Sequence, residues 1–78
     1  MDNVKQMYCV KLGTKRVSKH EGKAFTLGSK RKAKAFRDAV NKDVYDKIIH
    51  HAHVKDISVD AVVNAWVKDG ILAYVSAV

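Results

Sequence analysis

The feature that most constrains the fold of this chain is a densely apolar stretch between Ser58 and Gly70. Its apolar residues recur three and four positions apart, as they do on one face of a helix: Val59, Val62, Val63, Trp66 and Val67. Serine is a preferred helix N-cap, and glycine accepts the left-handed conformation that often ends a helix. We therefore expect an amphipathic helix here whose apolar face contributes most of the core.

The length of the chain leaves room for one such core. Seventy-eight residues make a single domain, which we expect to span residues 1–78. Hydrophobic residues make up 47% of the chain and charged residues 29%, a balance typical of a folded globular domain. Cys9 is the only cysteine, which excludes an intramolecular disulfide and a cysteine-based zinc site.

The sequence also bears on location. No stretch approaches the roughly 20 apolar residues of a membrane span, and the start, MDNVKQMYCVKLG, lacks the apolar run of a signal peptide. A single cysteine fits a reducing compartment best. We therefore expect a cytoplasmic protein that makes no contact with a membrane.

The N-terminal third is typical of antiparallel strands. As in a half-buried strand, residues 4–12 place Gln6, Tyr8, Val10 and Leu12 on one face and Lys5, Met7, Cys9 and Lys11 on the other. Gly13-Thr14 then offers a tight turn. Residues 15–27 then form either one irregular partner strand or two short strands broken at HEG. In both versions we expect Phe25 and Leu27 to face the core.

Two further helices are predicted in the middle of the chain. Ser29 can cap the first, which begins with KRKAKAFRDAVN and has an apolar stripe formed by Ala33, Phe36, Ala39 and Val40. Its opposite face should be basic and solvated, with Lys30, Lys34, Arg37 and Asn41 along it. Asp43 can cap the second, whose inward residues would be Val44, Tyr45, Ile48, Ile49 and Ala52.

The last eight residues, ILAYVSAV, are rich in β-formers and predict a strand that closes the sheet beside the N-terminal hairpin. The expected order is therefore β-β-α-α-α-β. We expect a small α+β domain with an N-terminal hairpin or meander, three helices on one face of the antiparallel sheet, and a C-terminal strand.

The net charge of +7 is unevenly distributed. Residues 1–37 contain eleven Lys or Arg and two acids, whereas residues 38–78 contain four Lys and six Asp. Several cations lie at the start of the first helix, where positive charge opposes the helix dipole and a bound phosphate would be stabilised. The candidate phosphate-binding residues are Lys15, Arg16, Lys19, Lys23, Lys30, Arg31, Lys32, Lys34 and Arg37.

This distribution favours a small, non-enzymatic protein that binds DNA or RNA through phosphate contacts. The same cations could also bind an acidic partner protein, as in a small phage-type or accessory factor that inhibits or regulates an enzyme, or could serve solubility alone. The apolar C-terminal strand is in addition a candidate pairing edge for a homodimer.

The stretch AHVKDISVDAVVNAWVKDG resembles a helix-turn-helix, and WVKDGILAYV is similar to the passage from recognition helix to wing in winged-helix domains. The resemblance covers about a third of the chain and implies a second route to DNA binding. The helix after the turn exposes Asp60, Asn64 and Lys68, with Asp69 at its end, whereas base readout needs side chains that approach base edges between phosphates. We therefore expect a structural role for this helix.

The sequence predicts neither catalysis nor a bound cofactor. It contains no glycine-rich phosphate loop, nucleophile elbow or HExxH motif. His50 and His53 have a spacing that can share a metal on a helix, but two ligands do not make a site. We therefore expect no metal.

Overall fold

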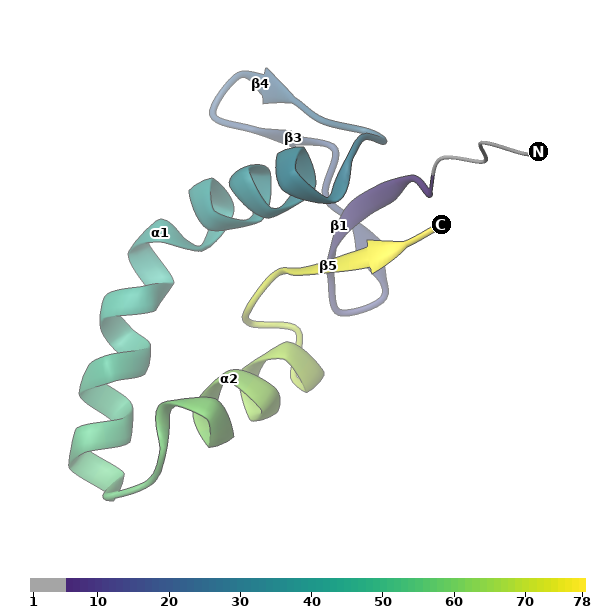
Figure 1. The fold of residues 1–78 in the computed structure, drawn as a ribbon. Helices are drawn as coiled ribbons and strands as arrows, with labels where there is room; N and C mark the ends of the chain where they lie inside the picture. Colours follow the sequence, from purple (N-terminus) through teal and green to yellow (C-terminus); the bar gives the residue numbers. More distant parts are fainter. Residues whose placement is uncertain (1–5) are drawn as a thin grey trace.

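The structure, a computed structural model, describes residues 6–78. Within these residues, five strands and two helices follow one another (Figure 1). Their bounds are β1 Tyr8–Leu12, β2 Lys15–Arg16, β3 Lys19–His20, β4 Lys23–Ala24, α1 Lys30–Lys55, α2 Val59–Lys68 and β5 Tyr74–Ala77. The chain is thus a small α+β domain, but the expected β-β-α-α-α-β order is wrong in both its helix and its strand count.

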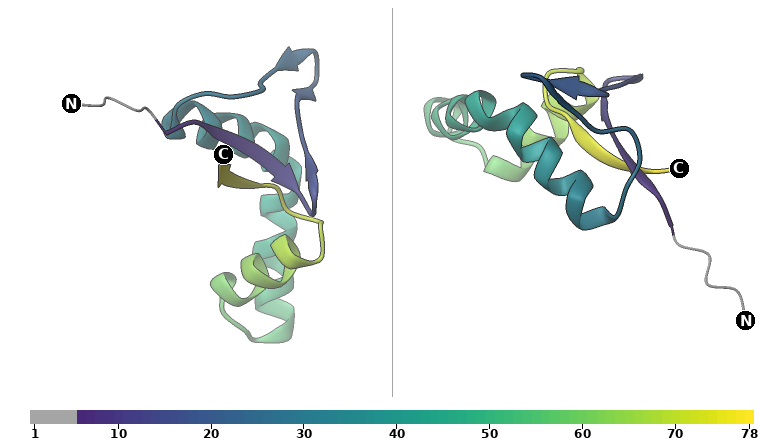
Figure 2. Two further views of the ribbon diagram at one scale, coloured as in Figure 1. Left: turned by 90° about the vertical axis from the view of Figure 1, so that its right-hand side faces the viewer. Right: turned by 90° about the horizontal axis from the view of Figure 1, so that it is seen from above.

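Three strands form an antiparallel sheet in the order β2-β1-β5, so the first and last strands of the chain lie side by side (Figure 2). The β1–β2 turn consists of Gly13 and Thr14, because Leu12 pairs with Lys15. Gly13 has a φ of 64°, a conformation that glycine adopts at no steric cost. The expected turn and the closing C-terminal strand are therefore present.

Residues 15–27 break into short strands rather than one partner strand. β3 and β4 form a separate hairpin whose turn residues, Glu21 and Gly22, have φ values of 50° and 82°. Phe25 fixes this hairpin to the body by stacking on Phe36 of α1, with the ring centroids 5.3 Å apart. The expectation that Leu27 faces the core is wrong, because 42% of this residue is exposed.

The two helices expected between residues 30 and 53 are one continuous helix, α1, of 26 residues. Neither glycine nor proline occurs between Lys30 and Lys55, so nothing in the backbone requires a break at Asp43. Helix α1 ends only at Asp56, which adopts a left-handed conformation and donates its N–H to the carbonyls of Ala52 and His53. Asp43, a residue suited to capping, therefore lies in the interior of α1.

Helix α1 changes direction near its middle, so that its first half lies against the sheet and its second half beside α2 (Figures 1 and 2). Two hydrophobic clusters follow this division. One joins Val10 and Ala73 of the sheet region to Ala33 and Phe36 of α1. The other contains Ile48, Ala52, Val62 and Leu72. The core is therefore bipartite, and α2 supplies only part of it.

Asn41 lies where the two halves of α1 meet, and its predicted position on the solvated face is wrong. The residue is 2% exposed and forms two hydrogen bonds with the backbone of Ala73. Ala39, Ile49 and Val59, all expected to be inward, are exposed. The remaining predicted core residues of α1 and α2 are buried or half-buried.

The two helix starts agree with the predicted N-caps. The Ser29 hydroxyl accepts a hydrogen bond from the backbone N–H of Lys32, and the Ser58 hydroxyl accepts one from Ala61. Neither described helix combines the length and the apolar character that would let it cross a membrane.

Candidate nucleic-acid interface

Strand β2 presents its two cations on opposite faces of the sheet. Lys15 lies opposite Leu12, whose side chain packs toward α1, whereas Arg16 lies opposite Lys11. Directly opposite residues of antiparallel strands share a face, so Arg16 and Lys11 are neighbours on the face that points away from α1. Lys11 is a cation that the sequence-based set omitted, although the alternation of residues 4–12 already placed it away from the apolar face.

The β3–β4 hairpin also divides its cations. Lys19 lies opposite Ala24 and Lys23 lies opposite His20, so the two lysines point to opposite faces of the ribbon. Both are exposed. The hairpin contains one acid, Glu21, whose carboxylate is 3.9 Å from His20 Nε2. Within residues 6–78, no ion pair neutralises either lysine.

The start of α1 carries the densest group of cations. Lys30, Arg31, Lys32 and Lys34 are exposed, and the first turn contains no acid. Two backbone hydrogen bonds between Tyr8 and Gly28, of 2.9 and 3.1 Å, hold this end of the helix against β1. Lys30 Nζ lies over the Tyr8 ring, 5.9 Å from its centroid. The position of the cationic helix start is therefore set by the sheet.

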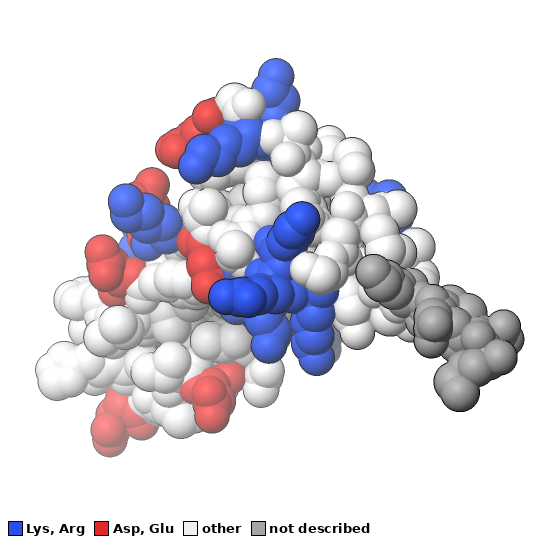
Figure 3. Space-filling view, turned by 45° about the horizontal axis from the view of Figure 1, so that its top comes forward, with Lys and Arg blue, Asp and Glu red and all other residues white. Residues whose placement is uncertain are grey.

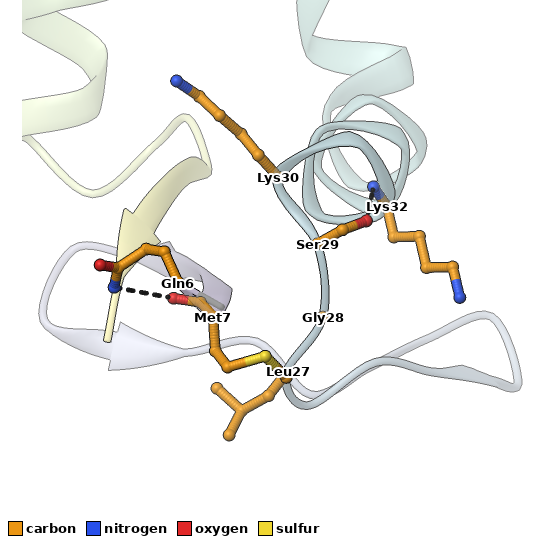
Figure 4. A pocket seen from close by; sticks show the side chains of 7 residues that line it. All are labelled: Gln6, Met7, Leu27, Gly28, Ser29, Lys30 and Lys32. Atoms are coloured by element: carbon orange, nitrogen blue, oxygen red, sulfur yellow. Dashed lines mark hydrogen bonds between the residues drawn. The ribbon is translucent and has the colours of Figure 1, made fainter. Parts of the chain in front are cut away.

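A shallow hollow lies beside this helix start and is lined by Gln6, Met7, Leu27, Gly28, Ser29, Lys30 and Lys32. Figure 4 shows the lysine side chains diverging on either side of Ser29, while Met7 and Leu27 form an apolar border. The two ammonium groups do not converge on one point. This geometry suits an extended polyanion that contacts them separately better than a single small anion held between them.

Arg37 differs from the other candidates because it has a partner. Its guanidinium donates two hydrogen bonds, of 2.9 and 3.0 Å, to Oδ1 of Asp38, which also accepts one of 2.7 Å from the Tyr45 hydroxyl. Burial raises the pKa of the Asp38 carboxyl, but the hydrogen bonds from Tyr45 and Arg37 outweigh burial and lower this pKa overall. Burial and the Asp38 hydrogen bond raise the pKa of the Tyr45 hydroxyl. The charge of Arg37 is thus largely neutralised by Asp38 within the protein.

The nine predicted residues therefore do not form one uniform patch. Figure 3 shows Lys and Arg in several groups on the visible face, separated by uncharged surface and by scattered acids. Eight of the nine are exposed, and Arg37 is half-buried. Among the described residues, the salt bridges are those of Arg37 and His20, so the eight exposed cations have no ion-pair partner.

Aromatic and polar side chains add little base recognition. Phe25 stacks on Phe36, and Tyr8 packs against the sheet cluster, so neither ring is free to stack on a base. Helix α2 exposes Asp60, Asn64 and Lys68, as expected. The described residues contain no group of three His, Cys, Asp or Glu side chains placed to hold a metal ion.

Comparison with known proteins adds no relative. The chain matches no family model, no curated protein and no solved structure.

Proposed function

We propose that this protein binds nucleic acid through phosphate contacts made by eight exposed cations of β2, the β3–β4 hairpin and the start of α1, which have no ion-pair partner within residues 6–78. The observation that carries the proposal is the first turn of α1, where cations stand without an acid at the positive end of the helix dipole. Such an arrangement costs folding free energy, and a polyanion bound there would convert the cost into affinity.

The proposal concerns binding without sequence readout. The exposed cations are mostly lysines on short strands and a helix start, which suits contact with phosphates rather than with base edges. The exposed face of α2 carries Asp60 and no arginine, so it does not serve as a recognition helix in this proposal. We further propose a non-enzymatic role in the cytoplasm, where the buried Cys9 thiol would stay reduced.

The test is a salt titration of binding to single-stranded DNA, duplex DNA and RNA. The test variant replaces Lys30, Arg31 and Lys32 by Gln. The matched control replaces by Gln three exposed lysines farther along α1, which are Lys42, Lys47 and Lys55. Both variants lose three charges. The plot of log affinity against log salt concentration has a negative slope, to which each phosphate contact contributes about 0.7 to 0.9. We expect the magnitude of this slope to decrease by about 2 to 3 in the test variant only.

Two results would overturn the proposal. One is the absence of binding to all three nucleic acids at low salt. The other is an equal loss in test and control variants, because a net-charge effect would then account for binding without an interface at the helix start.

A further inference from the structure

Among residues 6–78, strand β5 forms an open edge of the sheet, since the order β2-β1-β5 leaves one of its sides without a strand. Val78 donates its N–H to the Met7 carbonyl at 2.9 Å, and opposite residues of antiparallel strands alternate between hydrogen-bonded and non-bonded pairs. The backbone groups of Ala77 and Val75 therefore point away from β1. They face the open side of the sheet.

The first position on this edge is already occupied by a side chain. Ala73 has the same orientation as Val75 and Ala77, and its N–H and C=O are bonded by the Asn41 amide at 2.9 Å each. An amide side chain that both donates to and accepts from one residue reproduces the hydrogen bonds of a neighbouring strand. Beyond Ala73, the only side-chain hydrogen bond to this edge from the described residues is the one that the Ser76 hydroxyl donates to the Ala77 carbonyl, at 3.4 Å.

The two edges of the sheet differ in a way that singles out β5. Strand β2 has only two residues, both cationic, which are features that prevent strand pairing in natural proteins. Strand β5 has four residues, YVSA, without charge or proline. One edge is therefore protected against addition of a strand and the other is not.

Helix α1 carries a stripe of cations toward the Ala73 end of this edge. Asn41 bonds Ala73 at one end of β5, while Lys30 lies over Tyr8, which pairs with Ala77 at the other end. The first half of α1 therefore begins beside β1, where Tyr8 bonds Gly28, and reaches the edge of β5 at Asn41, over about 16 Å of helix. Figure 2 shows this arrangement in its view from above. Lys34 and Arg37 lie between the two ends on the same helical stripe as Lys30 and Asn41.

From the open edge and this stripe together we infer that β5 is a docking edge for an extended acidic segment of a partner protein. The segment would pair with the outward backbone groups of Val75 and Ala77, as in strand-addition complexes. Its carboxylates would meet Lys30 and Lys34, which have no ion-pair partner among the described residues, whereas Arg37 is held by Asp38.

A second copy of this chain fits the edge less well. Pairing β5 with β5 would bring Lys30 and Lys34 of both copies to one shared edge, and each copy carries a net charge of +7. Like charges brought together oppose association. The charge of the stripe therefore selects an acidic occupant. This inference does not depend on nucleic-acid binding, because it uses backbone groups of β5 that the phosphate-binding proposal does not need.

The probe is a capped synthetic peptide of alternating valine and glutamate, added to isotope-labelled protein and followed by amide NMR. We expect the Val75 and Ala77 amides to shift and to exchange more slowly with solvent. A peptide with lysine in place of glutamate is the charge control, and one with N-methylated peptide bonds is the backbone control. Both should bind at least about tenfold more weakly.

The decisive variant is Ala77→Pro. It removes an outward N–H, and proline is tolerated on an edge strand where its nitrogen faces solvent. We expect about a tenfold loss of peptide affinity, with an unchanged urea midpoint and unchanged nucleic-acid binding. Ala77→Val, which keeps the N–H and favours strand, is the matched control and should bind the peptide normally.

Three results would overturn the inference. They are equal binding of the lysine peptide, normal peptide binding by Ala77→Pro, and dimerisation of the free protein that Ala77→Pro abolishes. The last would assign the edge to a second copy. Loss of peptide binding with retained nucleic-acid binding supports the inference, and retained peptide binding without nucleic-acid binding would remove the proposed function alone.

Discussion

Asn41 and Ala73 are joined by two reciprocal hydrogen bonds across the junction of the core. Nδ2 of Asn41 donates to the Ala73 carbonyl and Oδ1 accepts from the Ala73 N–H, each at 2.9 Å. Ala73 belongs to the sheet-side cluster, and its neighbour Leu72 belongs to the cluster between the helices. One side chain thus holds the middle of α1 to the segment that leads into β5.

Removal of this side chain should be costly. In Asn41→Ala the N–H and C=O of Ala73 lose their partners, and an unsatisfied buried polar group costs about 1 to 3 kcal/mol. We expect the free energy of unfolding in urea to fall by about 2 to 4 kcal/mol. Asn64→Ala, on the exposed face of α2, should change it by less than about 0.5 kcal/mol. Equal effects of the two substitutions would show that the Asn41–Ala73 pair contributes nothing to stability.

Asn41 also shows why part of the fold could not be predicted. Amphipathic periodicity counts a polar residue on a polar stripe as exposed, and the stripe of Lys30, Lys34 and Arg37 led to that interpretation of Asn41. Its partner is backbone that lies 32 positions away in sequence. Hydrogen bonds to such distant backbone leave no local signal, whereas the strand at Tyr8–Leu12 and both serine caps depend on neighbouring residues and were predicted.

The merged helix has a related cause. Asp43 has the chemistry of an N-cap, but capping residues also occur inside helices when the preceding turn continues. Residues 30–55 contain neither glycine nor proline, so no residue in this segment marks where a helix would have to break. The direction change of α1 instead follows from packing against two different partners, the sheet and α2 (Figure 1).

For the candidate site, the sequence predicted which segments carry the charge but not where each cation points. The directions of Lys19 and Lys23 follow from the register of the β3–β4 hairpin, and the sequence left two versions of residues 15–27 open. A shift of one residue in register moves every side chain to the other face. The exposure of the cations was therefore predictable, whereas the directions of their side chains were not.

Gly28 should not tolerate a side chain. A Cβ at this position would lie 2.9 Å from Cε1 of Phe25, whose ring is held by stacking on Phe36. We expect Gly28→Ala to lower the free energy of unfolding by about 1 to 3 kcal/mol through overpacking. In a double-mutant cycle with Phe25→Leu, a smaller side chain should relieve part of that loss. Additive effects would contradict the proposed clash.

The Asp38 cluster predicts a modest acid sensitivity. The folded pKa of Asp38 is lowered below its unfolded value, so its contribution to stability is present above about pH 4 and is lost as pH falls through the folded pKa. Because the carboxyl is about half exposed, we expect less than about 1 kcal/mol. Asp38→Asn should flatten the stability profile in this range, measured by urea unfolding at several pH values.

The Tyr45 hydroxyl offers an independent check of this cluster. In Tyr45→Phe the Asp38 pKa should rise toward its ordinary value, since a hydrogen bond to the carboxylate is lost. An NMR titration of the side-chain carboxyl would measure the shift. Tyr74→Phe is the control, because its hydroxyl donates to the Gly13 carbonyl instead. An unchanged Asp38 pKa in Tyr45→Phe would exclude this hydrogen bond as the cause.

The cations at the start of α1 should oppose folding while they favour ligand binding. Replacing Lys30 and Lys32 by Glu puts acids where the helix dipole stabilises them, so we expect the free energy of unfolding to rise by about 0.3 to 1 kcal/mol per residue at low salt. The same variant should bind nucleic acid less tightly. Lys42→Glu with Lys47→Glu, in the interior of α1, reverses as many charges without this dipole gain. Equal stabilisation by both variants would attribute the effect to net charge, whereas a gain confined to the helix start would show that folding alone does not account for the cations there.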